Sequence, residues 1–237
     1  MNRIIERVRQ ALGVTAGDGR DKLVFAKSAD FCACANAPIA AEERAGWMDR
    51  IREEAKALNL QVHESPDLAA CGAAIVALAQ ERAPEWGTLK QIMRWSDPVL
   101  DGLGLEACLP ADIAIKTVPD QDSFSEPQRQ EFRREVIASY IGITTADYLL
   151  ADTASLVLLG GRGRARSVSL VPSIHIAVVP AGRMLASYRQ MLSCLDAMAL
   201  PSNVSIITGP SKTADIEATL VHGAHGPREM HLFVVAS

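Results

Sequence analysis

The stretch ITTADYLLADTASLVLLGGRGRARSVSLVPSIHIAVV, residues 143–179, decides the fold that we expect for this chain. It contains two aliphatic runs, SLVLL and IHIAVV, whose length and composition are typical of buried strands. Two similar runs, VSIIT and HLFVV, follow toward the C-terminus. Because loops or helices separate these runs, the pattern predicts βαβ units and a largely parallel sheet that is covered on both faces.

The sequence before this stretch predicts helices that alternate with strands. The expected elements are helices at 2–12, 42–60, 68–81, 98–109 and from Pro127 onward, and strands at 61–65, 89–95 and 113–118. No internal repeat and no linker interrupts the order. We therefore expect one α/β domain over 1–237, with a helical N-terminal extension at 1–20 and a core that carries the polar motifs at 141–235.

The composition is that of an ordinary globular protein. Apolar residues make up 49% of the chain, charged residues 22% and aromatic residues 5%, so the core must be built mainly from aliphatic side chains. The net charge of −4 argues against nucleic acid as a partner, because binding to a phosphate backbone requires a strongly basic surface.

The sequence also bears on localisation. No run of about 18 apolar residues occurs, so no membrane span is expected. The first residues, MNRIIERVRQALGV, alternate charged and apolar side chains, unlike a signal peptide. The five cysteines form no CxxC pair, which argues against a zinc ribbon or an iron–sulfur cluster in this chain. We expect reduced thiols in a cytoplasmic protein without a bound metal or cofactor.

The first polar motif lies directly before the SLVLL run. Asp147 and the pair Asp152–Thr153 stand at junctions that lead into strands. Such residues often hydrogen-bond to neighbouring backbone amides, as turn residues do. The alternative is a ligand site, since the ends of strands in open α/β sheets commonly line a cleft. For Asp152 and Thr153 we favour the ligand site.

A glycine-rich loop, GGRGRARS, follows at residues 160–167. Its guanidinium groups can donate paired hydrogen bonds to a carboxylate or a phosphate, although a solvated surface loop would have the same composition. Arg166 is the strongest candidate for an anion ligand because it lies nearest the next strand, and Ser169 follows it. His175 stands within that strand, where it is either a hydrogen-bonded core histidine or a catalytic one.

The second polar motif is ITGPSKTADIE, residues 207–217. It predicts a strand that ends at Thr208, a turn, and then a helix that a hydroxyl side chain caps. The amides at such a helix start, with a lysine beside them, would bind an anion, whereas the spacing is not that of a Walker A loop. The candidate ligand-binding residues are Gly209, Pro210, Ser211, Lys212, Thr213 and Asp215.

A further loop, VHGAHGPRE, begins at residue 221. His222 and His225 invite the interpretation of a metal pair, but no third ligand lies nearby in the sequence, so we favour a loop that brings His225 and Arg228 to the edge of a cleft.

Three phrases together resemble the LUD-domain family: ITTADYLLADTASLVLL, then RSVSLVPSIHIAVV, then ITGPSKTADIEATLVHGAHGPREMHLFVV. The resemblance spans residues 141–235, whereas the chain before about residue 120 is similar only in layout. One position departs from the family pattern. The family commonly carries a glycine after Asp-Thr, whereas this chain has Ala154, whose Cβ restricts the local backbone.

The resemblance implies a fold like that of the NagB/RpiA/CoA-transferase group, a three-layer α/β/α arrangement. It also implies a role in the bacterial oxidation of L-lactate to pyruvate, as one component beside iron–sulfur partner proteins that hold the redox centres. On this view Arg166 and Lys212 would bind a small anionic metabolite, and Asp152, Thr153 and His175 would orient it or move a proton.

Two other functions stay open at this point. The first is a stand-alone isomerase, CoA-transferase-like or cyclo-ligase-like enzyme, in which Glu217 or Glu229 would be the candidate nucleophile. The second is a scaffold that docks partners through the helix at 127–140 or through the N-terminal helix.

Overall fold

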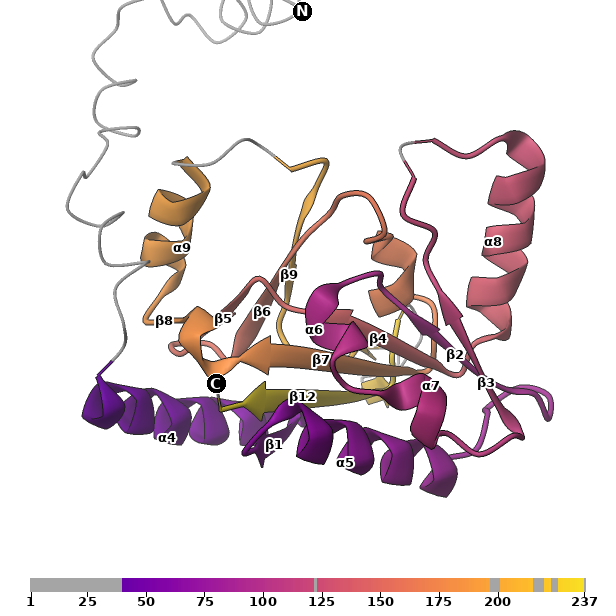
Figure 1. Ribbon diagram of the computed structural model, residues 1–237. Helices are drawn as coiled ribbons and strands as arrows, with labels where there is room; N and C mark the ends of the chain where they lie inside the picture. Colours follow the sequence, from indigo (N-terminus) through magenta and orange to yellow (C-terminus); the bar gives the residue numbers. More distant parts are fainter. Residues whose placement is uncertain (1–39, 122, 197–200, 215–219, 223–225, 237) are drawn as a thin grey trace, which may run out of the picture.

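The computed structural model describes residues 40–121, 123–196, 201–214, 220–222 and 226–236 (Figure 1). Its centre is a six-stranded sheet in the order β1-β12-β7-β4-β2-β3, and every neighbouring pair in it is parallel. The strands are β1 (Gln61–Ser65), β2 (Lys90–Arg94), β3 (Ile113–Thr117), β4 (Ile141–Thr145), β7 (Ile174–Pro180) and β12 (Glu229–Val235). The expected parallel sheet is therefore confirmed.

Helices cover both faces of this sheet, which gives the three-layer α/β/α arrangement. One face carries α4 (Ala41–Leu58) and α8 (Glu126–Ala138); the Gln91 side chain of β2 donates to the Glu135 carbonyl of α8 over 2.7 Å. The other face carries α5 (Leu68–Glu81), α6 (Pro98–Asp101) and α7 (Leu105–Cys108). There Arg94 of β2 forms ion pairs with Asp101 and Glu106.

The local sequence explains where these helices begin and end. The Asp67 side chain accepts from the Ala70 amide at 2.7 Å and so caps α5. A capping box of Ser125 and Gln128 starts α8, with proline in its first turn. The single helix expected at 98–109 is instead two short helices, because Gly104 between them adopts a left-handed conformation with φ of 64°.

A second, four-stranded sheet in the order β8-β5-β6-β9 packs beside the parallel one. It consists of β5 (Tyr148–Leu150), β6 (Ser155–Leu159), β8 (Met184–Leu185) and β9 (Val204–Ile207), with α9 (Tyr188–Asp196) against it. The SLVLL and VSIIT runs pair with each other here, antiparallel, rather than in the parallel sheet. The reason is the tight turn after β5, which folds β6 back onto it and away from the parallel sheet.

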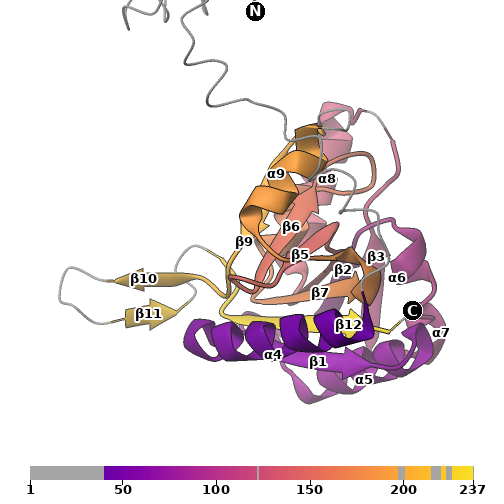
Figure 2. The ribbon, with the colours of Figure 1, turned by 90° about the vertical axis from the view of Figure 1, so that its left-hand side faces the viewer.

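Shorter elements complete the described chain. They are the 3-10 turns η1 (Arg166–Ser169) and η2 (Ala181–Arg183), and a hairpin of β10 (Lys212–Ala214) and β11 (Leu220–His222) that projects from the body (Figure 2). The helix expected at 2–12, and with it the extension at 1–20, lies outside the described residues. Among the helices that the structure describes, none combines the length and the apolar character that crossing a bilayer requires.

Candidate functional site

The two polar motifs of the sequence meet at one end of the four-stranded sheet. In the turn between β5 and β6, the Thr153 hydroxyl donates to Asp152 Oδ1 over 3.2 Å. Ser155, the first residue of β6, donates to Thr153 Oγ1 over 2.9 Å, and its hydroxyl lies 2.7 Å from Oγ1 of Thr208. Thr208 belongs to the second motif and stands directly before Gly209. We call Asp152, Thr153, Ser155 and Thr208 the hydroxyl chain.

The direction of the donors in the hydroxyl chain follows from its acceptor. Thr153 gives its proton to the Asp152 carboxylate and Ser155 gives its own to Thr153, so Thr208 donates to Ser155. All three protons point toward Asp152. Thr153 and Thr208 are exposed and Asp152 is half-buried, so the carboxylate and two of the hydroxyls are accessible from solvent. Because every hydroxyl proton is donated within the hydroxyl chain, the exposed groups offer acceptors, and the arrangement suits a small molecule that carries a hydroxyl donor.

Ala154 closes the turn in a conformation that suits glycine better than alanine. Its φ is 47°, in the left-handed region, and the residue is fully buried. Glycine would adopt this conformation without strain. The alanine Cβ makes the turn stiffer at a cost in backbone strain, directly beside Asp152 and Thr153.

The prediction of a helix after Pro210 is wrong. Lys212–Ala214 is the strand β10, which pairs antiparallel with β11. The Ser211 amide donates to the Pro227 carbonyl at 2.8 Å and keeps the chain extended, so its proton is not available for an anion. The β10–β11 ladder uses further backbone groups. A helix-start anion site therefore does not form at these residues.

The second motif is instead anchored on the C-terminal end of α4. Gly209 has a φ of 77° and a Cβ there would lie 3.0 Å from Leu58 Cβ, so this turn requires glycine. Pro210 is buried next to it, and the exposed Lys212 ammonium donates to the Ala57 carbonyl at 3.2 Å. The side chain of Thr213 and the residues Asp215, Glu217 and His225 lie outside the described part of the chain.

His175 is the second residue of β7, away from the turn that holds Asp152. Its ring is fully buried, and Nε2 lies 2.9 Å from Oγ1 of Thr144 on the neighbouring strand β4. Burial lowers the pKa of His175 to about 3, so the ring is neutral at physiological pH. Within the described residues its Nδ1 has no hydrogen-bond partner. Of the two interpretations of His175, these contacts favour the core histidine.

Of the arginines in the glycine-rich loop, Arg164 rather than Arg166 forms a half-buried cluster of charges. Arg166 is exposed at the start of η1, and the buried Ser169 donates to the Arg166 carbonyl at 3.0 Å. Arg164 forms ion pairs with Asp97 and Asp147, the latter at 2.8 Å. Asp97 caps α6 and accepts from Thr145 at 3.0 Å. The cluster thus fastens the loop to the carboxyl ends of β2 and β4.

Sequence reasoning missed Asp97, and it assigned the anion-binding role within the loop to a different arginine. One signal was present for Asp97: an aspartate directly before Pro98 is typical of a helix cap. For Arg164 the sequence held no such signal, because its two carboxylate partners come from separate loops.

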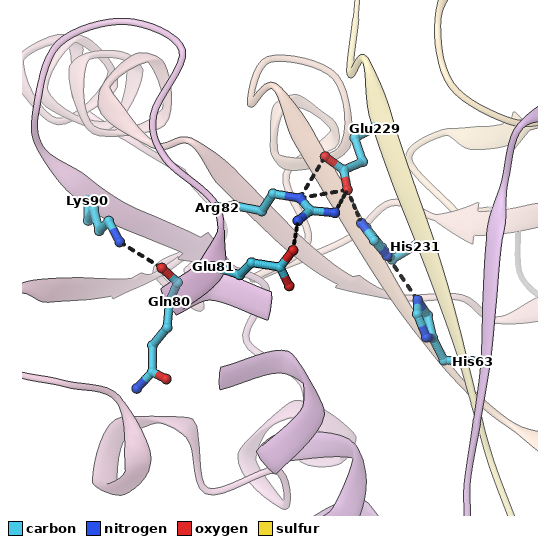
Figure 3. Close-up of polar contacts among 7 residues, drawn as sticks. All are labelled: His63, Gln80, Glu81, Arg82, Lys90, Glu229 and His231. Carbon is cyan, nitrogen blue, oxygen red and sulfur yellow. Dashed lines mark hydrogen bonds and ion pairs between the residues drawn. The ribbon is translucent and has the colours of Figure 1, made fainter. Parts of the chain in front are cut away.

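A second polar network connects β12 with β1 and α5 (Figure 3). Arg82 donates to both carboxylate oxygens of Glu229, one of which lies 2.7 Å from Nε2 of His231. Nδ1 of the fully buried His231 lies 3.0 Å from Nε2 of His63. Burial alone would raise the pKa of Glu229, but its bonds to Arg82 and His231 hold that pKa below its usual range. Because both carboxylate oxygens are engaged, Glu229 is a poor nucleophile.

A cavity of about 500 Å³ opens at the amino-terminal ends of β4, β7 and β12. Gly226 lines it, and a Cβ at that residue would lie 3.2 Å from Ser211 Cβ, so the second motif reaches the edge of the cavity. Across residues 40–121, 123–196, 201–214, 220–222 and 226–236, no group of three or more His, Cys, Asp or Glu side chains is placed to hold a metal ion.

Comparison with protein families and solved structures adds two findings. Residues 48–235 match the family model described as the LUD domain. The chain is also similar in fold to a DUF162 family protein from Deinococcus radiodurans, with a TM-score of 0.53 and 16% identity over 81% of this chain and 98% of that one. At this identity the likeness supports the fold alone.

Several curated relatives bear the name "Lactate utilization protein C". The one from Halalkalibacterium halodurans is 34% identical over 143 residues, covering 58% of this chain and 59% of that protein. The Bacillus subtilis protein is 32% identical over 136 residues (55% and 56%), and the Macrococcus caseolyticus protein 40% over 100 residues (40% and 43%). In each of these comparisons the match spans less than two thirds of the relative.

Proposed function

This chain belongs to the LUD-domain family, and from that premise we propose that it acts in bacterial lactate utilization, as a substrate-handling component of the system that oxidises L-lactate to pyruvate. The names of its relatives support the pathway. The hydroxyl chain, which joins the two motifs on one accessible surface, supports the substrate-handling role. This convergence of the motifs is the observation that carries the proposal.

The chemistry of a 2-hydroxy acid fits the hydroxyl chain. Such a substrate offers a hydroxyl proton, which a carboxylate accepts, and a carboxylate, which cations bind. Asp152 is the carboxylate in the hydroxyl chain, and Thr153 and Thr208 are the exposed hydroxyls. Lys212 follows Thr208 closely in the sequence, and we propose that it and Arg166 contribute positive charge to the anion.

Oxidation of a 2-hydroxy acid also requires an acceptor for two electrons. We propose that partner proteins with iron–sulfur clusters supply it, and that this chain presents the substrate to them. Asp152 would take the hydroxyl proton, and the hydrogen on C2 would leave with its two electrons to the acceptor that the partners supply. The proposal gives this chain binding, orientation and proton transfer, and gives the partners the redox step.

The experiment that tests the proposal is growth of a deletion strain on L-lactate as the sole carbon source, with glucose as the control carbon source. We expect the deletion to abolish growth on lactate only, and the wild-type gene to restore it. Asp152→Ala and Thr208→Val should fail to restore growth, because the first removes the acceptor of the hydroxyl chain and the second removes its outermost donor.

A matched control is Asp49→Ala, which removes an exposed carboxylate from α4, far along the chain from both motifs. It should restore growth fully. Normal growth of the deletion strain on lactate would refute the pathway. Full restoration by Asp152→Ala would keep the pathway but refute the role of the hydroxyl chain.

A further inference from the structure

The outer face of the four-stranded sheet leaves large apolar side chains exposed. Two of them belong to α9 and two to β9, and their exposed fractions are similar: Tyr188 47%, Leu192 48%, Val204 40% and Ile206 41%. We call these four residues the outer patch. Large apolar side chains that gather on one face mark a surface that another apolar surface covers.

The strand register explains why β9 exposes its half of the outer patch. Ile206 pairs with Val157 of the neighbouring strand β6, and Val204 pairs in the same way with Leu159. Side chains that pair across a ladder lie on the same face of the sheet. On β6 they are buried in a small apolar cluster with Met191 of α9. Because α9 packs against β8 and β5, at the other end of the sheet, it leaves the face of β9 bare.

The start of α4 lies beside this sheet. Arg44 and Met48, in the first turns of α4, line a small cavity of about 80 Å³ together with Met184 of β8. Ser65, the last residue of β1, lines the same cavity, so α4 begins at the carboxyl edge of the parallel sheet. Figure 1 shows β8 and α9 above the end at which α4 begins. The chain that precedes α4 therefore joins the described structure close to α9.

The other large apolar side chains that are exposed among the described residues lie at the opposite edge. Each of them stands shortly before the start of β2, β4 or β7, at the amino-terminal edge of the parallel sheet: Trp86, Leu89, Ile137, Leu170 and Val171. The outer patch is thus the exposed apolar surface nearest to the start of α4.

We propose that residues 2–12 form an amphipathic helix that packs on the outer patch. The apolar residues of MNRIIERVRQAL recur at helical spacing, with charged and polar residues between them: Ile4, Ile5, Val8 and Leu12. A helix shorter than about 12–15 residues is marginal on its own in water, so this one requires an apolar surface to pack against. The outer patch supplies that surface.

The chain between this helix and α4 is long enough for the packing. Residues 13–40 separate the two elements, and a chain of that length can span up to roughly 90 Å. The far end of β9 lies about one length of α4 away, because a Cβ at Gly209, just after β9, would lie 3.0 Å from Leu58 Cβ at the end of α4. The 18 residues of α4 rise by only about 27 Å. Both ends of the outer patch are therefore within reach.

The packing has a consequence for the candidate site. It completes the layer over the four-stranded sheet and supports β9, whose last residue, Ile207, directly precedes Thr208 of the hydroxyl chain. The proposal does not depend on the proposed function, because it concerns only how this sheet is covered.

Hydrogen–deuterium exchange of the full chain, measured by mass spectrometry, tests the packing. We expect the backbone amides of residues 4–12 to exchange at least about tenfold more slowly than in a synthetic peptide of residues 1–14, because only a packed helix protects them. Ile206→Asp and Val8→Asp should each return these amides to the rate of the matching free peptide, since each places a charge within the apolar contact.

Two matched variants separate the outer patch from a general effect of added charge. Leu89→Asp places the same charge on a 54% exposed apolar residue at the opposite edge of the molecule. Gln10→Asp places it on the polar side of the expected helix. Both variants should keep the protection of residues 4–12. The amides of β7 and β12, measured in the same experiment, report whether each variant is folded.

Three outcomes would overturn the proposal. The first is exchange of residues 4–12 in the full chain as fast as in the free peptide. The second is slow exchange that Ile206→Asp leaves unchanged, because the segment would then pack elsewhere. The third is protection that appears only where sedimentation velocity, from about 1 to 100 μM, detects a dimer. The outer patch would then be covered by a second copy of the chain.

Discussion

At the scale of single residues, Ala154 shows how one methyl group shapes the candidate site. It occupies a left-handed backbone conformation that costs an L-residue about 1–2 kcal/mol, yet its side chain is fully buried and so contributes packing. The two effects oppose each other beside Asp152 and Thr153. The alanine therefore alters the rigidity of the turn more than the stability of the whole protein.

Substitutions at this residue test that balance. We expect Ala154→Gly to change the free energy of unfolding by between zero and a gain of about 1 kcal/mol, because relief of strain offsets the lost methyl contact. Ala154→Val should lose more than about 2 kcal/mol, since a β-branched side chain is strained there and overfills the core. Urea unfolding measures both. If Ala154→Gly lowered the free energy of unfolding as much as Ala154→Val, packing rather than backbone strain would determine the stability at this position.

At the scale of elements, glycines set how closely the layers approach. A Cβ on Gly142, the second residue of β4, would lie 1.9 Å from the Val168 carbonyl oxygen of η1. Gly46, in α4, has nothing within 4 Å of the same position. The first glycine is thus required by the contact between two elements, whereas the second only loosens a helix.

This difference predicts opposite signs for the same substitution. Gly142→Ala should lower the free energy of unfolding by more than about 3 kcal/mol, because η1 must move off the sheet. Gly46→Ala should raise it by up to about 1 kcal/mol through helix propensity. Thermal and urea unfolding of both variants provide the measurement. A tolerated Gly142→Ala would mean that η1 does not pack on β4 as described.

The sequence predicted single elements better than it predicted their partners. Apolar spacing located α4 because it reports which face of a helix is buried, and a proline typical of a first helical turn located α8. It could not assign SLVLL and VSIIT to a separate antiparallel sheet, since an aliphatic run has the same composition in either sheet. β10 was mistaken for a helix start, because Gly-Pro-Ser suits both a turn into a helix and a turn into a hairpin.

For the candidate site, too, the sequence predicted single residues better than their partners. Asp152 and Thr153 stood out in the sequence as polar residues beside a strand, but their link to Thr208 through Ser155 depends on the pairing of β6 with β9. Pairing over such a distance in the chain leaves no local pattern.

At the scale of the whole molecule, buried histidines link stability to pH. Burial lowers the pKa of His175 to about 3, and burial is also the largest cause that lowers the pKa of His63 and of His231. The unfolded chain binds these protons with a pKa of about 6.5. Above a pH of about 6.5 the rings are neutral in both states, and the stability of the fold is not reduced by protonation. As the pH falls below about 6.5 toward the pKa values of the folded protein, protons bind the unfolded chain preferentially and the free energy of unfolding decreases.

The expected result is a steady loss of unfolding free energy below neutrality. His175 alone should lower the free energy of unfolding by about 1 kcal/mol between pH 6.5 and 5.5, because its ring stays neutral in the folded protein and becomes protonated in the unfolded chain. Urea unfolding at several pH values measures the slope, and His175→Gln should reduce it by that amount. A stability that stays constant from pH 7.5 to 5.5 would contradict the neutral, buried state of these rings.

The strand order has a consequence for biosynthesis. β12 ends at Val235, near the C-terminus, yet it lies between β1 and β7 and pairs with both. Until β12 has been synthesised, β1 has no neighbour in the sheet. The sheet therefore cannot close before β12 has left the ribosome, and until then its apolar strand edges are exposed to chaperones and to aggregation.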